Sequence, residues 1–269
     1  MTLKLLLWAS LPGILVLLYI VKRDLFPEPK GAIISATVLG FLIFLPHNLL
    51  FILIGDYYFE LVNINKNLGN EVFLNLLESL FQAAFVEETF KYLIFLLLIS
   101  RFNAFNEPMD AIVYGVCVSL GFSLMETIEW SKIYFDEYGE NRAVAMAKIR
   151  SYSSNILHAG CGVIMGSILS KAFFQNKNGF LKLFLALLVP ILIHGFYNYG
   201  IDSGQVFLTY LLLFVCAVLV LVGWRQTREN QKLKNIKKEE KVISINIFNI
   251  SGVIILNFLI VLLLIKLLS

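Results

Sequence analysis

Charged side chains are scarce in this chain, and their scarcity excludes a soluble domain. Lysine, arginine, aspartate and glutamate together make up 15% of the 269 residues, whereas apolar residues make up 58%. The mean hydropathy is +0.78, which is typical of chains that lie mostly in lipid. The net charge of +3 is small, so we expect no nucleic-acid partner. The composition predicts an integral membrane protein whose main partner is the lipid bilayer.

Disulfides and two common hydrolase motifs are also missing. The three cysteines, Cys117, Cys161 and Cys216, lie singly inside apolar runs, so we expect small core residues and no disulfide. No Gly-x-Ser-x-Gly elbow is present, which argues against a serine hydrolase of that type. The HExxH spacing of many zinc proteases is absent as well. If the chain is a hydrolase, these absent motifs leave open whether it uses a metal.

Apolar runs long enough to cross a membrane are abundant. About eight runs of roughly 17–29 residues are present, and a helical span needs about 20 residues. They lie at 5–21, 33–54, 72–100, 111–130, 152–174, 180–201, 206–224 and 250–268. No small-residue cleavage site follows the first run, so we expect it to be retained. The prediction is an all-α, polytopic helix bundle with about eight transmembrane helices, forming a single membrane domain over 1–269.

Basic residues gather in the connections and predict how the chain is oriented. Lysine and arginine concentrate in 22–30, in 171–182 and most densely in 225–241, which we expect to be a basic loop before a final transmembrane helix at 250–268. Such connections stay on the cytoplasmic side of a cell membrane. An even number of crossings then places both termini outside the cytoplasm. The connection 131–150 also carries basic residues and is the one complication.

Four of the apolar runs carry ionisable side chains, which an ordinary span excludes. One such group at the centre of a bilayer costs about 2.5–3.5 kcal/mol even on a lenient scale. The groups are Glu87 and Glu88, Glu126, His158 and His194. At about 1.5 Å per helical residue from the cytoplasmic ends of their runs, they lie at roughly 18–24 Å, in the outer half of the bilayer. A shared depth on four helices predicts one polar site.

The helical faces agree with a single site. Lys91 follows Glu87 by four residues, so the two side chains lie on one face and can pair. Small residues recur every four positions on either side of His158, which predicts that this histidine lies where helices pack closely. Asn198 comes one turn after His194 and shares its face.

These groups also have explanations other than catalysis. A single histidine in a span is often a satisfied interhelical hydrogen bond, and Glu126 alone could be a structural partner of Lys91. Glu87 and Glu88 are harder to explain in this way, because neighbouring carboxylates repel and one is then suited to general-base work. A membrane transporter or channel would use the same groups as ion or proton sites. No inverted repeat is visible, which counts against that alternative. A non-catalytic scaffold is the third alternative.

A set of motifs in order resembles the PrsW-type intramembrane protease family. These motifs are KRDLFPEPKG, EETFK, PMDAIVYGVCVSLGFSLMET, a lone histidine in LHAGCGVIMG, and HGFYN, and they extend over about residues 1–205. The chain departs from the family at Ala111, Thr127 and Asn198, where glycine, asparagine and aspartate are usual. A His-x-x-x-Asn turn also occurs in the distantly related CAAX prenyl endopeptidase and bacteriocin-processing group. That group has a histidine where this chain has Glu126, so the PrsW family is the nearer match.

The resemblance implies a peptidase of regulated intramembrane proteolysis in a bacterial cell membrane, with its protease core at about 1–205. The substrate would be a single-span membrane protein such as an anti-sigma factor, cut on its extracytoplasmic side. The active site implied for this chain is formed by Glu87, Glu88, Glu126, His158 and His194.

The chemistry that we expect is peptide hydrolysis without a covalent intermediate. Glu88, or Glu87, would deprotonate a water together with His158. His194 and Asn198 would stabilise the oxyanion, a task worth about 2.7–4 kcal/mol for each donor in other proteases.

Glu126 has two possible roles, and the metal question stays open. This carboxyl would orient a histidine or share a proton with the glutamate pair. In a glutamate-type protease no cofactor is needed. In a metalloprotease the site would bind zinc, because two histidines and a carboxylate are a common catalytic ligand set. The ligands would then be Glu88, Glu126, His158 and His194.

Overall fold

The computed structural model describes residues 2–67, 69–175, 179–234 and 247–269, and over these residues it contains helices and no strand. The elements are α1 (Leu3–Lys22), α2 (Lys30–Leu42), α3 (Phe44–Asn67), α4 (Glu71–Leu76), the π-helix η1 (Leu77–Phe85), α5 (Val86–Leu97), the 3-10 turn η2 (Ile99–Arg101), α6 (Pro108–Tyr138), α7 (Glu140–Tyr152), α8 (Ser154–Phe174), α9 (Gly179–Asp202), α10 (Val206–Lys234) and α11 (Ile247–Leu268). The prediction of an all-α bundle is confirmed.

Seven helical segments of the described chain are long and apolar enough to cross a membrane. They correspond to the predicted spans with one exception, the run 72–100. That run is helical from Glu71 to Leu97, but it is divided between α4, η1 and α5 and carries Glu87, Glu88 and Lys91. Its charges make it less apolar than an ordinary span. The polytopic membrane architecture is confirmed.

One predicted span and two predicted connections differ from the sequence expectation. The predicted span 33–54 is divided between α2 and α3, and α3 continues to Asn67. The connection 131–150 is helical rather than a loop, because α6 continues to Tyr138 and α7 begins at Glu140. Residues 225–234 of the expected basic loop belong to α10, which ends at Lys234, and the remainder of that loop lies outside the described residues. A charged helix can extend beyond a membrane into water. The change from apolar to charged residues therefore predicts where a span ends, but it does not predict where the helix ends.

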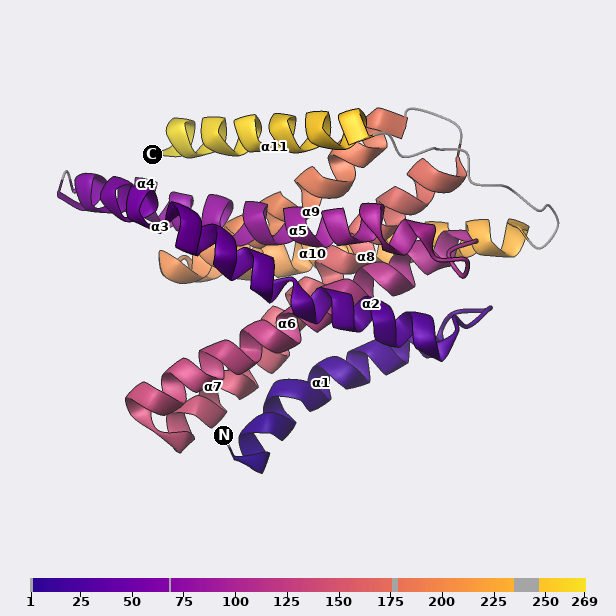
Figure 1. Cartoon of the computed structure of the whole chain (residues 1–269), viewed down its shortest axis with the longest axis horizontal. Helices are drawn as coiled ribbons and strands as arrows, with labels where there is room; N and C mark the ends of the chain where they lie inside the picture. Colours follow the sequence, from indigo (N-terminus) through magenta and orange to yellow (C-terminus); the bar gives the residue numbers. More distant parts are fainter. Residues whose placement is uncertain (1, 68, 176–178, 235–246) are drawn as a thin grey trace.

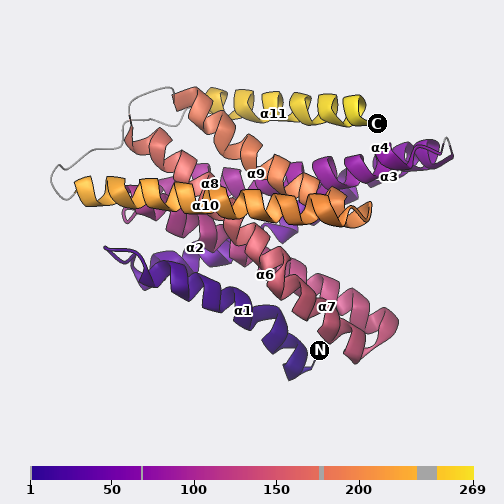
Figure 2. The ribbon, with the colours of Figure 1, turned by 180° about the vertical axis from the view of Figure 1, so that it is seen from behind.

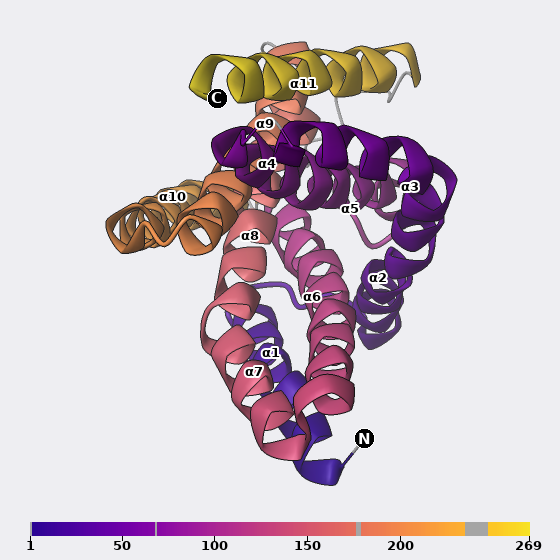
Figure 3. The same cartoon turned by 90° about the vertical axis from the view of Figure 1, so that its left-hand side faces the viewer.

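Helices α6 and α8 form the centre of the bundle and run side by side (Figure 3). Glycines allow this close approach: a Cβ added to Gly115 on α6 would lie 2.6 Å from the carbonyl oxygen of Gly162 on α8. Small residues at such positions let membrane helices pack backbone to backbone. Helices α1 and α2 pack on α6, while α9 and α10 pack on α8.

The two termini lie towards the same end of the bundle. Figure 1 shows the N-terminus of α1 and the C-terminus of α11 towards the left of the view, and the α1–α2 connection at the right. Figure 2 shows α10 on the outside of the bundle, where it crosses α8. Four helices carry the candidate site and pack on one another in the interior of the bundle. They are α5, α6, α8 and α9.

Candidate active site

Ionisable side chains from α5, α8 and α9 meet in the interior of the bundle. One ligand atom from each of Glu87, Glu88, His158 and His194 lies within 4.8 Å of the corresponding atoms of the other three. All four residues are buried, and Glu88 is fully buried. The structure thus brings together groups that are as far as 107 residues apart in the sequence. Such burial of ionisable groups inside a membrane protein is typical of a functional site.

The π-helix η1 ends immediately before the glutamate pair and packs on α9. Its Leu80 lies against Gly195, where an added Cβ would meet the Leu80 side chain at 2.5 Å and its Cα at 3.1 Å. Gly195 therefore lets α9 approach η1 closely at the residue next to His194. Long π-helical segments are rare and occur often at functional sites. Here the π-helix ends at Phe85, and Glu87 and Glu88 lie in the first turn of the α-helix α5 that follows it.

The ammonium group of Lys91 lies among the acceptors of this cluster. Its Nζ is 2.7 Å from Glu88 Oε1, 3.6 Å from Glu87 Oε2 and 3.0 Å from His158 Nδ1. It also lies 4.4 Å from the ring centroid of Phe122, a cation–π contact. The sequence predicted a pair of Lys91 with Glu87, whereas the closer partner is Glu88. With 1% of its side chain exposed, Lys91 is the cation that balances part of the buried negative charge.

Both ring nitrogens of His158 are occupied. Nδ1 lies 3.0 Å from Lys91 Nζ, and Nε2 lies 3.0 Å from Glu126 Oε2. An ammonium group only donates, so the tautomer assigned to His158 accepts at Nδ1 and donates its Nε2 hydrogen to Glu126. The imidazole thereby links the α5 charges to the α6 carboxylate.

His194 is held differently. Its Nδ1 lies 3.0 Å from Glu88 Oε1, and its Nε2 lies 4.0 Å from Glu87 Oε2. A carboxylate accepts, so we assign the hydrogen to Nδ1 and the lone pair to Nε2. The lone pair of Nε2 is then directed to the side of the cluster where Glu87 lies. The rings of His158 and His194 are 4.9 Å apart between centroids and nearly perpendicular, at 88°.

Arg150 is a residue of the site that sequence analysis missed. Its Nη2 forms a 2.5 Å ion pair with Glu126 Oε2 and donates a 2.9 Å hydrogen bond to Ser154 Oγ. Glu126 therefore joins Arg150 of α7 to His158 of α8. The spacing of four residues from Arg150 to Ser154 to His158 was a signal, but it was obscured because this part of the chain looked like a polar connection. Arg150 and Glu126 are partly exposed, so they form the outer side of the cluster.

Two carboxylate oxygens in the cluster have no hydrogen-bond partner among the described residues. They are Oε2 of Glu87 and Oε2 of Glu88, and both atoms are buried. A bare buried acceptor costs about 1–3 kcal/mol, so these atoms are suited to a water, a substrate N–H group or a cation. Asn198 lies one turn after His194 and is half-buried, and in the described part of the chain it makes no hydrogen bond.

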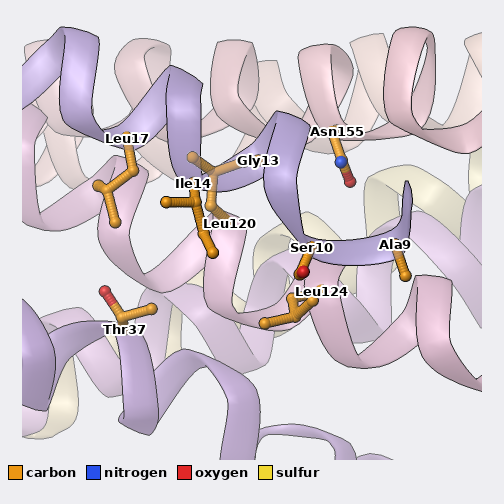
Figure 4. Close-up of a pocket in the computed structure, with 9 residues that line it drawn as sticks. All are labelled: Ala9, Ser10, Gly13, Ile14, Leu17, Thr37, Leu120, Leu124 and Asn155. Carbon is orange, nitrogen blue, oxygen red and sulfur yellow. The ribbon is translucent and has the colours of Figure 1, made fainter. Parts of the chain in front are cut away.

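A small pocket beside the site contains none of these groups. It lies between α1, α2, α6 and α8 and has a volume of about 30 Å³ (Figure 4). Its lining is mostly apolar, with Ser10, Thr37 and Asn155 as polar members. Asn155 is fixed by a 2.6 Å hydrogen bond from Ser123. The pocket has room for about two waters, and none of the ionisable groups of the site lines it.

The donor set of the cluster fits a metal ion in its chemistry. Two histidines and two carboxylates with converging ligand atoms suit Zn²⁺. The set differs from the one expected from the sequence, because Glu87 belongs to it and Glu126 lies beyond it, on the far nitrogen of His158. Lys91 already contacts Glu88 and His158, so a metal ion and this ammonium group would compete for the same acceptors.

Comparisons with known proteins identify the family of this chain. A family model described as "PrsW family intramembrane metalloprotease" matches residues 28–223. Protease PrsW of Bacillus subtilis (strain 168) is 32% identical over 227 residues, which are 84% of this chain and 93% of that protein. Protease PrsW of Oceanobacillus iheyensis is 30% identical over 223 residues, 82% of this chain and 93% of that protein. No solved structure matches significantly.

Proposed function

Because this chain belongs to the PrsW family of intramembrane metalloproteases, we propose that it hydrolyses its substrate with a water held between Glu87, Glu88 and His194. The chain is an intramembrane peptidase that acts on a membrane protein in the lipid bilayer. The observation that carries the proposal is the pair of bare, buried Oε2 atoms of Glu87 and Glu88 beside the histidines. A water there would complete the hydrogen bonds that these oxygens lack.

Glu87 is the proposed general base, and Glu88 is the anchor of the cluster. Glu88 Oε1 is engaged by both Lys91 at 2.7 Å and His194 at 3.0 Å, which leaves it less basic. Glu87 Oε2 is farther from Lys91, at 3.6 Å, and has the weaker ion pair. A water that donates to Glu87 and to the Nε2 lone pair of His194 would be oriented for attack. The sequence favoured Glu88 as the base, and the distances support Glu87.

The transition-state oxyanion needs a hydrogen-bond donor, and Asn198 is the proposed one. Its carboxamide N–H groups have no partner in the described chain. With its hydrogen on Nδ1 and directed to Glu88, neutral His194 has none to give at Nε2, so this histidine orients the water instead. A single oxyanion donor is worth about 2.7–4 kcal/mol in other proteases.

Glu126 and Arg150 have positioning roles in this proposal. Glu126 accepts from His158 Nε2 and fixes that ring, and Arg150 fixes Glu126. The ring of His158 in turn holds Lys91 beside Glu88 through Nδ1. This series of contacts holds Lys91 at hydrogen-bond distance from Glu88 Oε1, and leaves Glu87 Oε2 only the longer 3.6 Å ion pair.

His158, His194, Glu87 and Glu88 are the residues that would hold a zinc ion. When bound, such an ion would acidify a water and polarise the scissile carbonyl. Without an ion Glu87 accepts the proton of the water, whereas with one bound Glu87 would be a ligand instead. Asn198 would face the oxyanion in both cases.

Two substitutions test the assignment of the glutamates. Glu87→Gln should lower kcat for a single-span substrate by at least ~10² while thermal stability is kept. Glu88→Gln should lower both, because it leaves Lys91 without its 2.7 Å partner. Glu78→Gln is the matched control, since Glu78 lies on η1 with an exposed side chain. Normal cleavage by Glu87→Gln would exclude it as the base, and normal cleavage by both variants would exclude a glutamate-dependent mechanism.

The substrate is proposed to be a single-span protein such as an anti-sigma factor, cut on the extracytoplasmic side of a bacterial cell membrane. The basic residues in 22–30 and 171–182, together with the even number of predicted crossings, support extracytoplasmic termini. A cysteine at the C-terminus, Ser269→Cys, tests this orientation, because the three native cysteines are buried. A membrane-impermeant thiol reagent should label it in intact cells. Labelling only after lysis would reverse the topology.

A further inference from the structure

A second cluster of carboxylates lies far from the active site. Asp24 and Glu28 belong to the α1–α2 connection, and Asp110 lies in the first turn of α6. One oxygen from each lies within 4.8 Å of the other two, and all three residues are buried. Asp110 precedes Glu126 by 16 residues on α6, which is about 24 Å along the helix. The cluster is therefore at the opposite end of α6 from the proposed catalytic groups.

Among the described residues, no basic side chain forms an ion pair with these carboxylates. Over the described residues, the ion pairs of the chain involve other acids, and none is formed by Asp24, Glu28 or Asp110. The neighbouring Arg23 directs its guanidinium over the ring of Tyr19, at 5.1 Å from the centroid. Buried carboxylates in proteins are paired, protonated or bound to a metal. Within the described part of the chain, the balancing positive charge is therefore left to protons or to a bound cation.

Hydrogen-bond donors fix one oxygen of Asp110 and leave the other bare. Oδ2 accepts from the backbone N–H groups of Asn106 and Glu107, both at 2.7 Å. Oδ1 is buried and has no partner in the described chain. Glu28 is fixed at one oxygen, because its Oε2 accepts from the hydroxyl of Tyr114. Donors that fix one carboxylate oxygen so that the other faces a cation are the usual surroundings of metal ligands.

Asp24 repeats the pattern. Its Oδ1 accepts from the backbone N–H of Phe26 at 3.1 Å and from Gln231 Nε2 at 2.6 Å, while Oδ2 is buried and bare among the described residues. Gln231 comes from α10 and is fully buried, and its amide oxygen also has no partner in that part of the chain. A neutral side chain with a bare buried oxygen thus adjoins the acidic cluster.

We propose that Asp24, Glu28 and Asp110 bind a divalent hard cation, Mg²⁺ or Ca²⁺. The donors are all oxygens, which these ions prefer, and nitrogen or sulfur ligands of the kind that zinc takes are lacking in this group. The ion would tie the α1–α2 connection to the start of α6 and, through Gln231, to α10. It is distinct from any metal at the glutamate–histidine cluster.

Protons are the competing occupants. Burial raises the pKa of Asp24 and also that of Glu28, so both carboxyls bind protons more readily than in water. Metal ligands must lose their protons before they bind, and the cation should therefore bind more weakly as the pH falls.

The test uses the purified full chain, stripped with a chelator, and Mn²⁺ as a paramagnetic probe. We expect a Mn²⁺ ion that Mg²⁺ or Ca²⁺ displaces. Asp110→Asn and Asp24→Asn should weaken this binding at least ~10-fold, and Gln231→Leu by about 10–100-fold, as for other residues that support a ligand. Asp136→Asn is the matched control, because Asp136 is an exposed carboxylate on the same helix α6.

Thermal unfolding gives a second readout that does not depend on cleavage. Added Mg²⁺ or Ca²⁺ should raise the Tm of the wild type and of Asp136→Asn, and at the same concentration should raise that of Asp24→Asn by less. If Asp110→Asn does not fold, the Mn²⁺ affinity and the Tm of Asp24→Asn alone test the proposal. Equal Mn²⁺ affinity in the wild type and both cluster variants would overturn the proposal. So would a Tm that rises on acidification but ignores the cation, since the cluster would then hold protons.

Discussion

Removal of the Lys91 charge is the most direct test of the electrostatics of the site. Lys91→Met keeps the length of the side chain and its contact with Phe122 but leaves two buried carboxylates without their shared cation. Removal of one partner of a buried ion pair typically costs about 3–5 kcal/mol. We therefore expect a loss of this size in the free energy of unfolding, together with a loss of cleavage.

A double-mutant cycle separates the two carboxylates. Lys91→Met combined with Glu88→Gln removes both partners of the 2.7 Å pair, so the double variant should lose less stability than the sum of the two single variants. The coupling energy should be about 2–3 kcal/mol for Glu88. It should be smaller for Glu87, whose oxygen is 3.6 Å from Lys91. Unfolding in detergent, with and without a chelator, measures each corner of the cycle.

Two results would refute this reasoning. A coupling to Glu88 below about 0.5 kcal/mol would mean that the pair is not formed in the membrane protein. A coupling to Glu87 larger than that to Glu88 would reverse the roles assigned to the two glutamates.

Three further variants test other parts of the site and bundle. Arg150→Ala should lower turnover by about 10–100-fold, because a small misplacement of a positioned group has that effect, whereas Arg142→Ala, exposed on the same helix, should not. Asn198→Ala should lower kcat by roughly 10–10³ with substrate affinity kept, and Asn198→Asp should be poorly active. If Asn198→Asp instead keeps full activity and binds more zinc, the metal mechanism is favoured. Gly115→Ala should destabilise the α6–α8 contact by about 1–3 kcal/mol, while Gly55→Ala, with open space around it, should not.

The meeting of the ionisable groups could be predicted from the sequence because a membrane leaves them few alternatives. A glutamate or histidine inside a span must find a polar partner, and the only candidates at a similar depth were the groups on the other spans. The helical ruler placed Glu88, His158 and His194 at one level, and the structure has them in contact with one another or with Lys91. The glycine spacing near His158 likewise predicted the close packing of α8, which the structure realises against α6.

The finer arrangement could not be predicted from the sequence. The preference of Lys91 for Glu88 depends on the rotation of α5, which follows the π-helix η1, and no composition signal marks a π-helix in advance. Arg150 was missed because charged residues in 131–150 suggested a loop, whereas α7 brings this side chain back to Glu126. The sequence could not predict that Asp24 lies close to Asp110, since this proximity depends on how the α1–α2 connection packs on α6.

The charge balance of the active site bears on the metal question. The acids are Glu87, Glu88 and Glu126, the bases are Lys91 and Arg150, and the histidines are neutral in the tautomers assigned above. With all three carboxyls ionised, three negative and two positive charges leave the site at −1, and Lys91→Met would then leave it at −2. A divalent cation would then bring the variant to neutrality, and zinc should bind Lys91→Met more tightly than the wild type if the ammonium is the resident cation of the cluster. If the wild type binds zinc as tightly as the variant does, Lys91 and the metal occupy different positions, and the competition inferred from the 2.7 Å and 3.0 Å contacts does not occur.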